Sequence, residues 1–201
     1  PETRPDPLLS NLFERSAQVY DPENPPDLPR EYDPNYGRRR PRPSQKAREG
    51  DFTSYAFRVN HRALPEVWRE IELAEDQTLE DLHLATQQAY GWYDDHLYSF
   101  FMSGKAWDNN TEIGCPWSES ALHTHQVQVG QLDLDEGQKF LYLFDYGDGH
   151  EFDVQMMRIN RNAKKNEYPK LVGQRGESPP QYPDYDEDTG EMSWDPHGHL
   201  R

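Results

Sequence analysis

The sequence predicts an α+β domain, in which a mostly antiparallel sheet of five to six strands carries one main helix packed on one face. Three observations predict it. Short runs of alternating apolar and polar residues, typical of strands, recur along the chain. In the body of the chain, only residues 79–90 repeat apolar side chains at helical spacing. Residues 140–159 form two alternating runs around a glycine-flanked acidic turn, which indicates a hairpin. One helix covers one face of such a sheet, so we expect the other to be partly open.

The hairpin at residues 140–159 determines which side chains we expect on each face. Asp148-Gly149 favours a two-residue loop, and this loop sets Gly147 opposite His150. In that register one face, expected to be the core face, carries Leu141, Leu143, Asp145, Phe152, Val154 and Met156. The other face mixes aromatic rings with acids and is either a covered layer or a groove: Phe140, Tyr142, Phe144, Tyr146, Glu151, Asp153 and Gln155.

The other elements follow in chain order. Strands are expected over residues 52–60, 67–73 and 97–102, with a weak edge strand at 124–129. Thr78 and Asp81 resemble a capping box at the start of the helix, and Gly91 ends it. Residues 103–120 contain glycine, asparagine and proline and are expected to be a long loop, and the chain after residue 160 to be loop and tail.

Composition divides the chain into an arm, a domain and a tail. The 17 prolines and the apolar content of 33% predict a normal domain at residues 51–183 with disordered or extended ends. The arm, residues 1–50, is rich in proline and arginine and has one possible short amphipathic helix, and the tail, residues 184–201, is acidic.

The charge is unevenly distributed. The arm carries nine basic and nine acidic residues, so the formal charge of −16 arises from residues 51–201. An acidic body repels phosphate backbones, which makes a protein or basic peptide a better partner than nucleic acid, although solubility alone explains the charge equally well. The basic cluster Arg38–Arg48 in the arm is either a nucleic-acid or acidic-partner contact or a solvated linker.

The cellular setting is inferred from cysteine use and hydropathy. Cys115 is the single cysteine, so an intrachain disulfide and a thiolate zinc cage are both excluded. We therefore expect a reducing, cytoplasmic setting. No apolar run approaches ~18 residues, which predicts no membrane span.

Several motifs together resemble one known family. They are PEVWREI at 65–71, LEDLHLATQQAYGW at 79–92, HLYSF at 96–100, FLYLFDYGD at 140–148, Tyr168-Pro169, Gly176 and PPQY at 179–182. On these residues the chain resembles the plasmid pRiA4b ORF-3-like family. The resemblance implies a compact α+β domain encoded on plasmids, mobile elements and bacterial chromosomes, without a settled activity. Family members often have tryptophan at the position of His150 and histidine at that of Phe152, so no role of that family histidine transfers to this chain.

Three polar residues are the candidates for catalysis. Asp145, Asp148, Glu151 and Asp153 cluster around the hairpin turn, and with His150, and in a wider set His96, they could bind a hard divalent cation. The alternative is that Asp145 accepts backbone N–H groups of the turn or pairs with Arg69, and that Asp148 is a turn residue. His96 lies at the junction between helix and strand, either as a general base or as a group that caps the junction.

Two further sets of side chains are binding candidates. His123 and His125 lie at i and i+2 on an expected strand, so both point one way and suit zinc or nickel, although no third ligand is evident. Aromatic and basic side chains beside acids suit a cationic peptide or a planar ring, although such rings are more often core: Trp68, Arg69, Trp92, Tyr142, Phe144 and Tyr146.

Three functions remain open. The first is a non-catalytic protein or peptide interaction module, favoured by the acidic charge and by the lack of a catalytic signature such as a P-loop or nucleophile elbow. It needs no cofactor. The second is a metal-dependent hydrolase or nuclease at His96, Asp145 and Asp148. The third is a DNA-associated accessory factor of a mobile element, in which the arm makes the contact.

Overall fold

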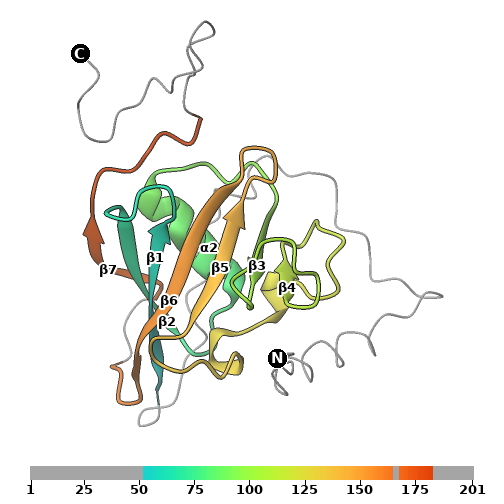
Figure 1. Ribbon diagram of the computed structural model, residues 1–201. Helices are drawn as coiled ribbons and strands as arrows, with labels where there is room; N and C mark the ends of the chain where they lie inside the picture. The colour runs from blue at the N-terminus through green and yellow to red at the C-terminus, as the bar shows by residue number, and fades with distance from the viewer. Residues whose placement is uncertain (1–51, 165–167, 183–201) are drawn as a thin grey trace, which may run out of the picture.

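The computed structural model describes residues 52–164 and 168–182 and contains a seven-stranded antiparallel sheet (Figure 1). The strand order is β4-β3-β5-β6-β1-β2-β7. The elements are β1 (Ser54–His61), β2 (Trp68–Ala74), α2 (Leu79–Tyr90), β3 (Tyr98–Phe101), β4 (Glu112–Gly114), the 3-10 turns η2 (Thr124–Gln126) and η3 (Val129–Gln131), β5 (Lys139–Phe144), β6 (His150–Asn160) and β7 (Lys170–Arg175). The predicted α+β class is confirmed.

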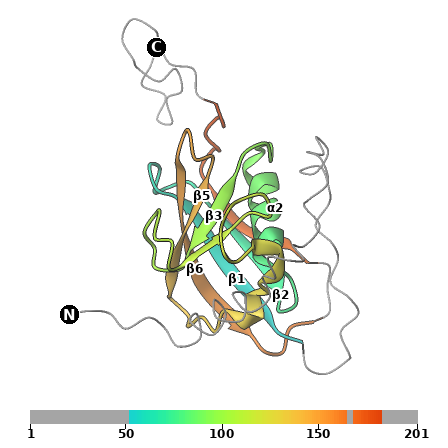
Figure 2. The ribbon, with the colours of Figure 1, turned by 90° about the vertical axis from the view of Figure 1, so that its right-hand side faces the viewer.

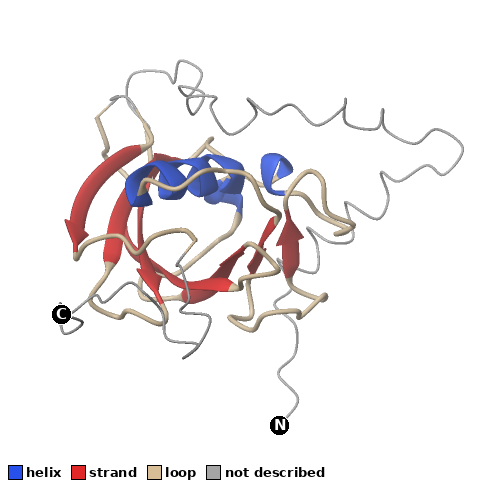
Figure 3. Ribbon diagram, turned by 90° about the horizontal axis from the view of Figure 1, so that it is seen from above, coloured by secondary structure: helices blue, strands red, loops and turns tan. Residues whose placement is uncertain are grey.

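The sheet curves around one side of α2, so the core lies between the helix and the concave face (Figures 2 and 3). Alternation along each strand sends one set of apolar side chains into this space. The core is strongly aromatic, and its largest fully buried side chains include Phe57, Phe100, Phe140, Tyr142, Phe144 and Phe152. A smaller apolar cluster lies on the convex face: Phe101, Leu141 and Leu143, with Ala106 and Tyr146 packed against it.

The helix begins and ends where its sequence predicts. The Thr78 hydroxyl accepts a hydrogen bond from the Asp81 N–H at 3.3 Å, and the Asp81 carboxylate accepts one from the Thr78 N–H at 2.8 Å. This reciprocal pair is the predicted capping box. Gly91 ends the helix in the left-handed conformation, with φ of 73°.

The hairpin is present, but its predicted register is wrong by three residues. Phe144, not Gly147, lies opposite His150, and residues 145–149 form a five-residue loop. An odd shift exchanges the two faces of a strand, so the aromatic residues of β5 point into the core and its leucines point to the convex face. The cause is Asp145, whose carboxylate accepts the N–H groups of Gly147 and Asp148 and organises a wider loop.

Two strands were not predicted, and one predicted strand is absent. β4 lies inside the expected loop at 103–120, and β7 lies inside the expected tail. The expected edge strand at 124–129 is instead covered by η2 and η3. Val127 and Val129 are buried in this segment, whose backbone bonds to the start of α2 and to the residues before it. The Leu79 N–H donates to the Val127 carbonyl, and the Val129 N–H donates to the Gln77 carbonyl.

The arm at residues 1–50, with its expected helix and the cluster Arg38–Arg48, lies outside the described residues, as does the tail at 184–201. Among the described helices, none combines the length and the apolar character needed to cross a bilayer.

Candidate functional site

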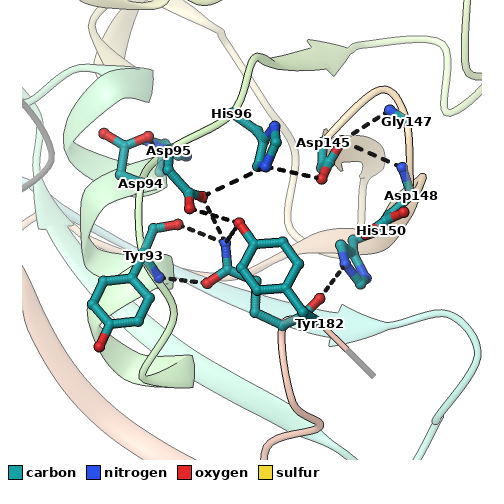
Figure 4. Close-up of polar contacts among 11 residues, drawn as sticks. Tyr93, Asp94, Asp95, His96, Asp145, Gly147, Asp148, His150 and Tyr182 are labelled. Carbon is teal, nitrogen blue, oxygen red and sulfur yellow. Dashed lines mark hydrogen bonds and ion pairs between the residues drawn. The ribbon is translucent and has the colours of Figure 1, made fainter. Parts of the chain in front are cut away.

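Three segments that are distant in sequence meet at one end of the sheet (Figure 4). They are the connector between α2 and β3 (residues 91–97), the β5–β6 loop (145–149) and a strap that follows β7 (176–182). Polar side chains from all three interact, and they include the predicted residues His96 and Asp145.

His96, which is exposed, lies beside the buried carboxylate of Asp145. The His96 Nε2 atom lies 3.4 Å from Asp145 Oδ2 and 4.0 Å from Asp95 Oδ1. Asp145 is fixed by the turn: Oδ1 accepts the Gly147 N–H at 2.8 Å and the Asp148 N–H at 3.3 Å, and its backbone has φ of 55°. The turn amides are therefore the partners of this buried acid, as one of the two alternatives predicted. Asp148 joins this contact through its backbone, and its side chain is exposed.

The strap is held to the connector by a dense set of hydrogen bonds. The Gln181 side chain accepts the Tyr93 N–H at 2.6 Å and donates to the Tyr93 carbonyl and to Asp95 Oδ1 at 2.9 and 2.8 Å. The Tyr182 hydroxyl donates to Asp95 Oδ2 at 2.6 Å, and the Trp92 indole donates to the Pro179 carbonyl at 2.8 Å. Desolvation, and then the bond to Asp95, raise the pKa of Tyr182.

Arg69 anchors the strap from beneath. Its buried guanidinium donates to the carbonyls of Ala89, at the end of α2, and Arg175, at the end of β7, and to the Ser178 hydroxyl at 2.6 Å. The helix C-terminus favours a cation at this place. The Arg69 guanidinium also lies over the Tyr90 ring, 4.7 Å from the ring centroid. Arg69 is thus a clamp between helix and strap, and it does not pair with Asp145.

A cleft of 330 Å³ opens between the connector and the strap. It is lined by Tyr90, Gly91, Trp92, Tyr93, Ser178, Pro179, Pro180, Gln181 and Tyr182. Tyr90 and Trp92 are almost fully buried and form the floor of the cleft, whereas Tyr93 and Tyr182 are 71% and 46% exposed and stand at its rim. Tyr182 lies between the cleft and His96, with the His96 and Tyr182 ring centroids 6.0 Å apart.

Comparison with known proteins identifies the family. The model of the plasmid pRiA4b ORF-3-like protein family matches residues 54–192. The chain belongs to this family. It is 31% identical over 121 residues to the uncharacterized protein y4hQ of Sinorhizobium fredii, a match that covers 58% of this chain and 59% of that relative. The chain therefore spans less than two thirds of the curated relative. A solved structure, a protein of unknown function from Methanosarcina mazei, shares the fold with a TM-score of 0.54 at 24% identity, covering 69% of this chain and 75% of the other.

Two further histidines of this pRiA4b ORF-3-like domain lie at the site: His150 is one of the predicted cation ligands, and His61 was not predicted. His61 is buried at the end of β1, packs edge-on to Phe152 and has no hydrogen-bond partner for Nδ1 among the described residues. Burial, and then the nearby His150, lower the pKa of His61 to about 4. His150 Nε2 lies 3.0 Å from the Gln181 carbonyl, which ties β6 to the strap. His61 continues the alternation of Phe57 and Val59, and this signal places it on the core face.

A second histidine–aspartate pair is buried in the core of the domain. His83 Nε2 lies 2.9 Å from Asp94 Oδ1, and Nδ1 lies 2.7 Å from the Tyr142 hydroxyl, which also accepts a bond from Gln87 at 2.8 Å. With a neutral imidazole, both protons in this hydrogen-bond network have an acceptor: the Tyr142 phenol donates to Nδ1, and the Nε2–H donates to Asp94. Burial raises the pKa of Tyr142. Helical spacing alone could place His83 on the buried face of α2.

Most of the predicted aromatic binding face is core. Tyr142 and Phe144 are fully buried beneath α2, so of the two predicted alternatives, a covered layer and a groove, the structure shows the covered layer. Tyr146 remains half-buried on the convex side, with its hydroxyl 2.6 Å from Ser99 Oγ and its ring packed edge-on against Trp107. Trp68 is also half-buried there, with the Arg58 guanidinium 4.4 Å from its ring centroid.

His123 and His125 do lie close together, although not on a strand. Their rings stack with centroids 5.8 Å apart, and His123 Nδ1 lies 2.9 Å from the Cys115 carbonyl. Burial lowers the pKa of His125. Within residues 52–164 and 168–182, no group of three or more histidine, cysteine, aspartate or glutamate side chains has the geometry to hold a metal ion, either here or around His96.

Proposed function

We propose that this domain binds an extended segment of a partner protein in the cleft between the connector and the strap, and that the segment carries at least one cationic side chain. The observation that carries the proposal is the exposed Tyr93 ring at the rim of an aromatic cleft. Exposed aromatic rings over a rigid floor are common anchors of protein interfaces, because they bury much apolar area at little cost in side-chain entropy.

The charges around the cleft support a cationic segment. Asp95 is exposed, and its carboxylate bonds to Gln181 and Tyr182, which line the cleft. A lysine or arginine placed on the Tyr93 ring would gain a cation–π contact, and Asp95 would attract it. The formal charge of the whole chain, −16, acts in the same direction and would speed the encounter at low salt.

Selection from a displayed peptide library at low salt tests the proposal. We expect the full chain to enrich peptides that contain lysine or arginine, and Tyr93→Ala to lower the affinity of the selected peptide about tenfold, which corresponds to the loss of one interface anchor. Trp107→Ala is the matched control, since it removes an exposed aromatic ring from the convex face. Selected peptides that lack cationic residues, or an equal loss in both variants, would count against the cleft.

A metal-dependent hydrolase is a second candidate, favoured by the exposed contact between His96 and Asp145. In such a pair the imidazole can act as a general base while the carboxylate orients it, or the two side chains can be two ligands of a divalent ion. Thermal unfolding of the full chain in Mg²⁺, Mn²⁺ and Zn²⁺ tests it, with His96→Ala as the comparison. An ion that stabilises the native chain and not the variant would support this candidate, and no stabilisation by any ion would reject it.

The DNA-associated function stays a prediction that depends on the arm. Its test is salt-sensitive DNA binding by the full chain that is lost when residues 37–48 are deleted. Binding that survives the deletion would assign the contact to another part of the chain.

A further inference from the structure

The two edges of the sheet differ in how they are protected (Figure 1). β4 is only three residues long, and its residues are half-buried or buried. A parallel bridge between Gly114 and His123 covers part of it, and the side chains of Ser118 and Ser120 pack against Gly114 so closely that a Cβ there would meet them. This edge is closed to any further strand.

β7 is the open edge. It pairs with β2 alone among the described residues, so its outer N–H and C=O groups face away from the sheet. Five of its six residues are exposed, including Leu171 at 45% and Val172 at 39%. The strand has no proline, although Lys170 and Arg175 at its ends and the register shift against β2 at Val172 are features that can weaken an edge. An open edge with exposed apolar side chains is the feature that strand-adding partners use.

The charges on β7 indicate the kind of partner. Lys170 and Arg175 stand at the two ends of the strand, and neither forms an ion pair within the described part of the chain. Two unpaired cations therefore flank the edge in a chain whose formal charge is −16. A second copy paired about the centre of the strand would set Lys170 opposite Arg175 of that copy, and like charges directly opposite each other are unfavourable.

Gly173 can make the edge selective for a particular partner residue. It lies against the Trp68 indole, and a Cβ at residue 173 would be 3.3 Å from that ring. Because the glycine has no side chain, the half-buried indole stays accessible past it on the convex face. A partner residue opposite Gly173 can lie on this ring, as aromatic side chains do across glycine in other sheets.

From this edge we infer a second binding site, independent of the cleft: β7 accepts an extended acidic segment of a partner protein as an eighth, antiparallel strand. The segment has an acid opposite each of Lys170 and Arg175, apolar residues opposite Leu171 and Val172, and an aromatic residue opposite Gly173. Backbone hydrogen bonds supply the affinity, and the terminal acids and the contact with Trp68 supply the specificity.

A designed peptide tests this inference on the full chain. The probe is acetyl-Glu-Thr-Tyr-Val-Ile-Glu-amide, and its control replaces both glutamates with lysine. We expect the acidic peptide to bind about tenfold more tightly than the control, since two cross-strand pairs change from attraction to repulsion. Hydrogen exchange should slow at amides of β7 that face outward and nowhere else in the sheet.

A pair of charge-reversal variants makes the test decisive. In Lys170→Glu/Arg175→Glu the preference should switch to the basic peptide, and in the control variant Lys105→Glu/Lys139→Glu it should stay with the acidic one. Four results overturn the inference: no binding of either peptide, equal binding of both, an equal response of the two variants, or protection of β7 by self-association without peptide.

Discussion

The domain contains two histidine–aspartate pairs, one on each side of the boundary between core and surface. In the buried pair the His83 and Asp94 side chains are 1% and 7% exposed, and in the other the His96 and Asp145 side chains are 43% and 9% exposed. Asp94 and His96 are only two residues apart in sequence. The same chemical pair thus occurs in two environments, and the connector supplies one member of each pair.

The two histidines differ in how many of their ring nitrogens have partners. Both ring nitrogens of His83 have partners, and its ring stacks on Tyr98 with centroids 3.5 Å apart. His96 has carboxylates on one nitrogen only, and these lie at 3.4 and 4.0 Å. A histidine that is buried with both nitrogens bonded orders the core, whereas one that is exposed with a fixed carboxylate beside it is free to meet a ligand.

The largest effect should come from breaking the buried pair. His83→Ala leaves Asp94 Oδ1 without its partner, removes the acceptor for the Tyr142 hydroxyl proton and opens a cavity, so we expect a loss of about 3–5 kcal/mol in the free energy of unfolding. Urea denaturation followed by tryptophan fluorescence measures it. A loss below ~1 kcal/mol would mean that this network does not order the core.

The second prediction concerns the loss of stability in acid, which should act through the buried imidazole of His61. The pKa of His61 is lowered from 6.5 to about 4, so the native state binds fewer protons than the unfolded state between these values. Stability conferred by the neutral ring is therefore complete above pH 6.5 and declines as the pH falls toward 4, by about 2–3 kcal/mol.

Denaturation curves between pH 7 and 4 measure this decline. In His61→Phe the slope should be shallower but still present, because burial also lowers the pKa of His150. If the slope in His61→Phe equals that of the native chain, His61 is not the acid-sensitive group.

The sequence carries local signals well, and it accounts for much of the fold. Thr78 with Asp81 and the αL glycine at residue 91 determine both ends of α2, and alternation locates β1, β2, β3 and the two strands of the hairpin. These features depend on residues within a few positions of each other, and local hydrogen bonding and side-chain direction decide them.

The features that the sequence does not reveal depend on contacts across long separations. The Asp148-Gly149 pair favours a two-residue loop, and only the bonds of Asp145 to the turn amides show why a five-residue loop forms instead. β7 has no buried face, so no hydrophobic period marks it. The cleft joins residues 90–93 to residues 178–182, and no local pattern connects these segments.

A third prediction concerns the strap, whose environment is intermediate between that of the His83–Asp94 pair and that of His96. Tyr182→Phe removes the hydroxyl that donates to Asp95 at 2.6 Å, and we expect a loss of about 1 kcal/mol, because the bond is charge-assisted but exposed. Hydrogen exchange at the Tyr93 amide, which the strap residue Gln181 covers, should become faster. An unchanged rate would mean that Gln181 holds the strap without help from Tyr182.

The smallest effect on stability should come from the exposed pair. His96→Ala should change the free energy of unfolding by no more than about 0.5 kcal/mol, as is typical of exposed charge pairs. Measured beside His83→Ala in one denaturant series, it defines the contrast between the two pairs. A loss close to that of His83→Ala would make His96 a structural residue.

Amide chemical-shift mapping with a cationic peptide selected against the full chain tests the proposed cleft most directly. The account predicts that the shifted amides cluster in residues 91–96 and 178–182, and that Tyr93→Ala weakens the shifts at a given peptide concentration. Shifts centred on the convex face around Trp107, or shifts at the cleft that Tyr93→Ala leaves unchanged, would contradict it.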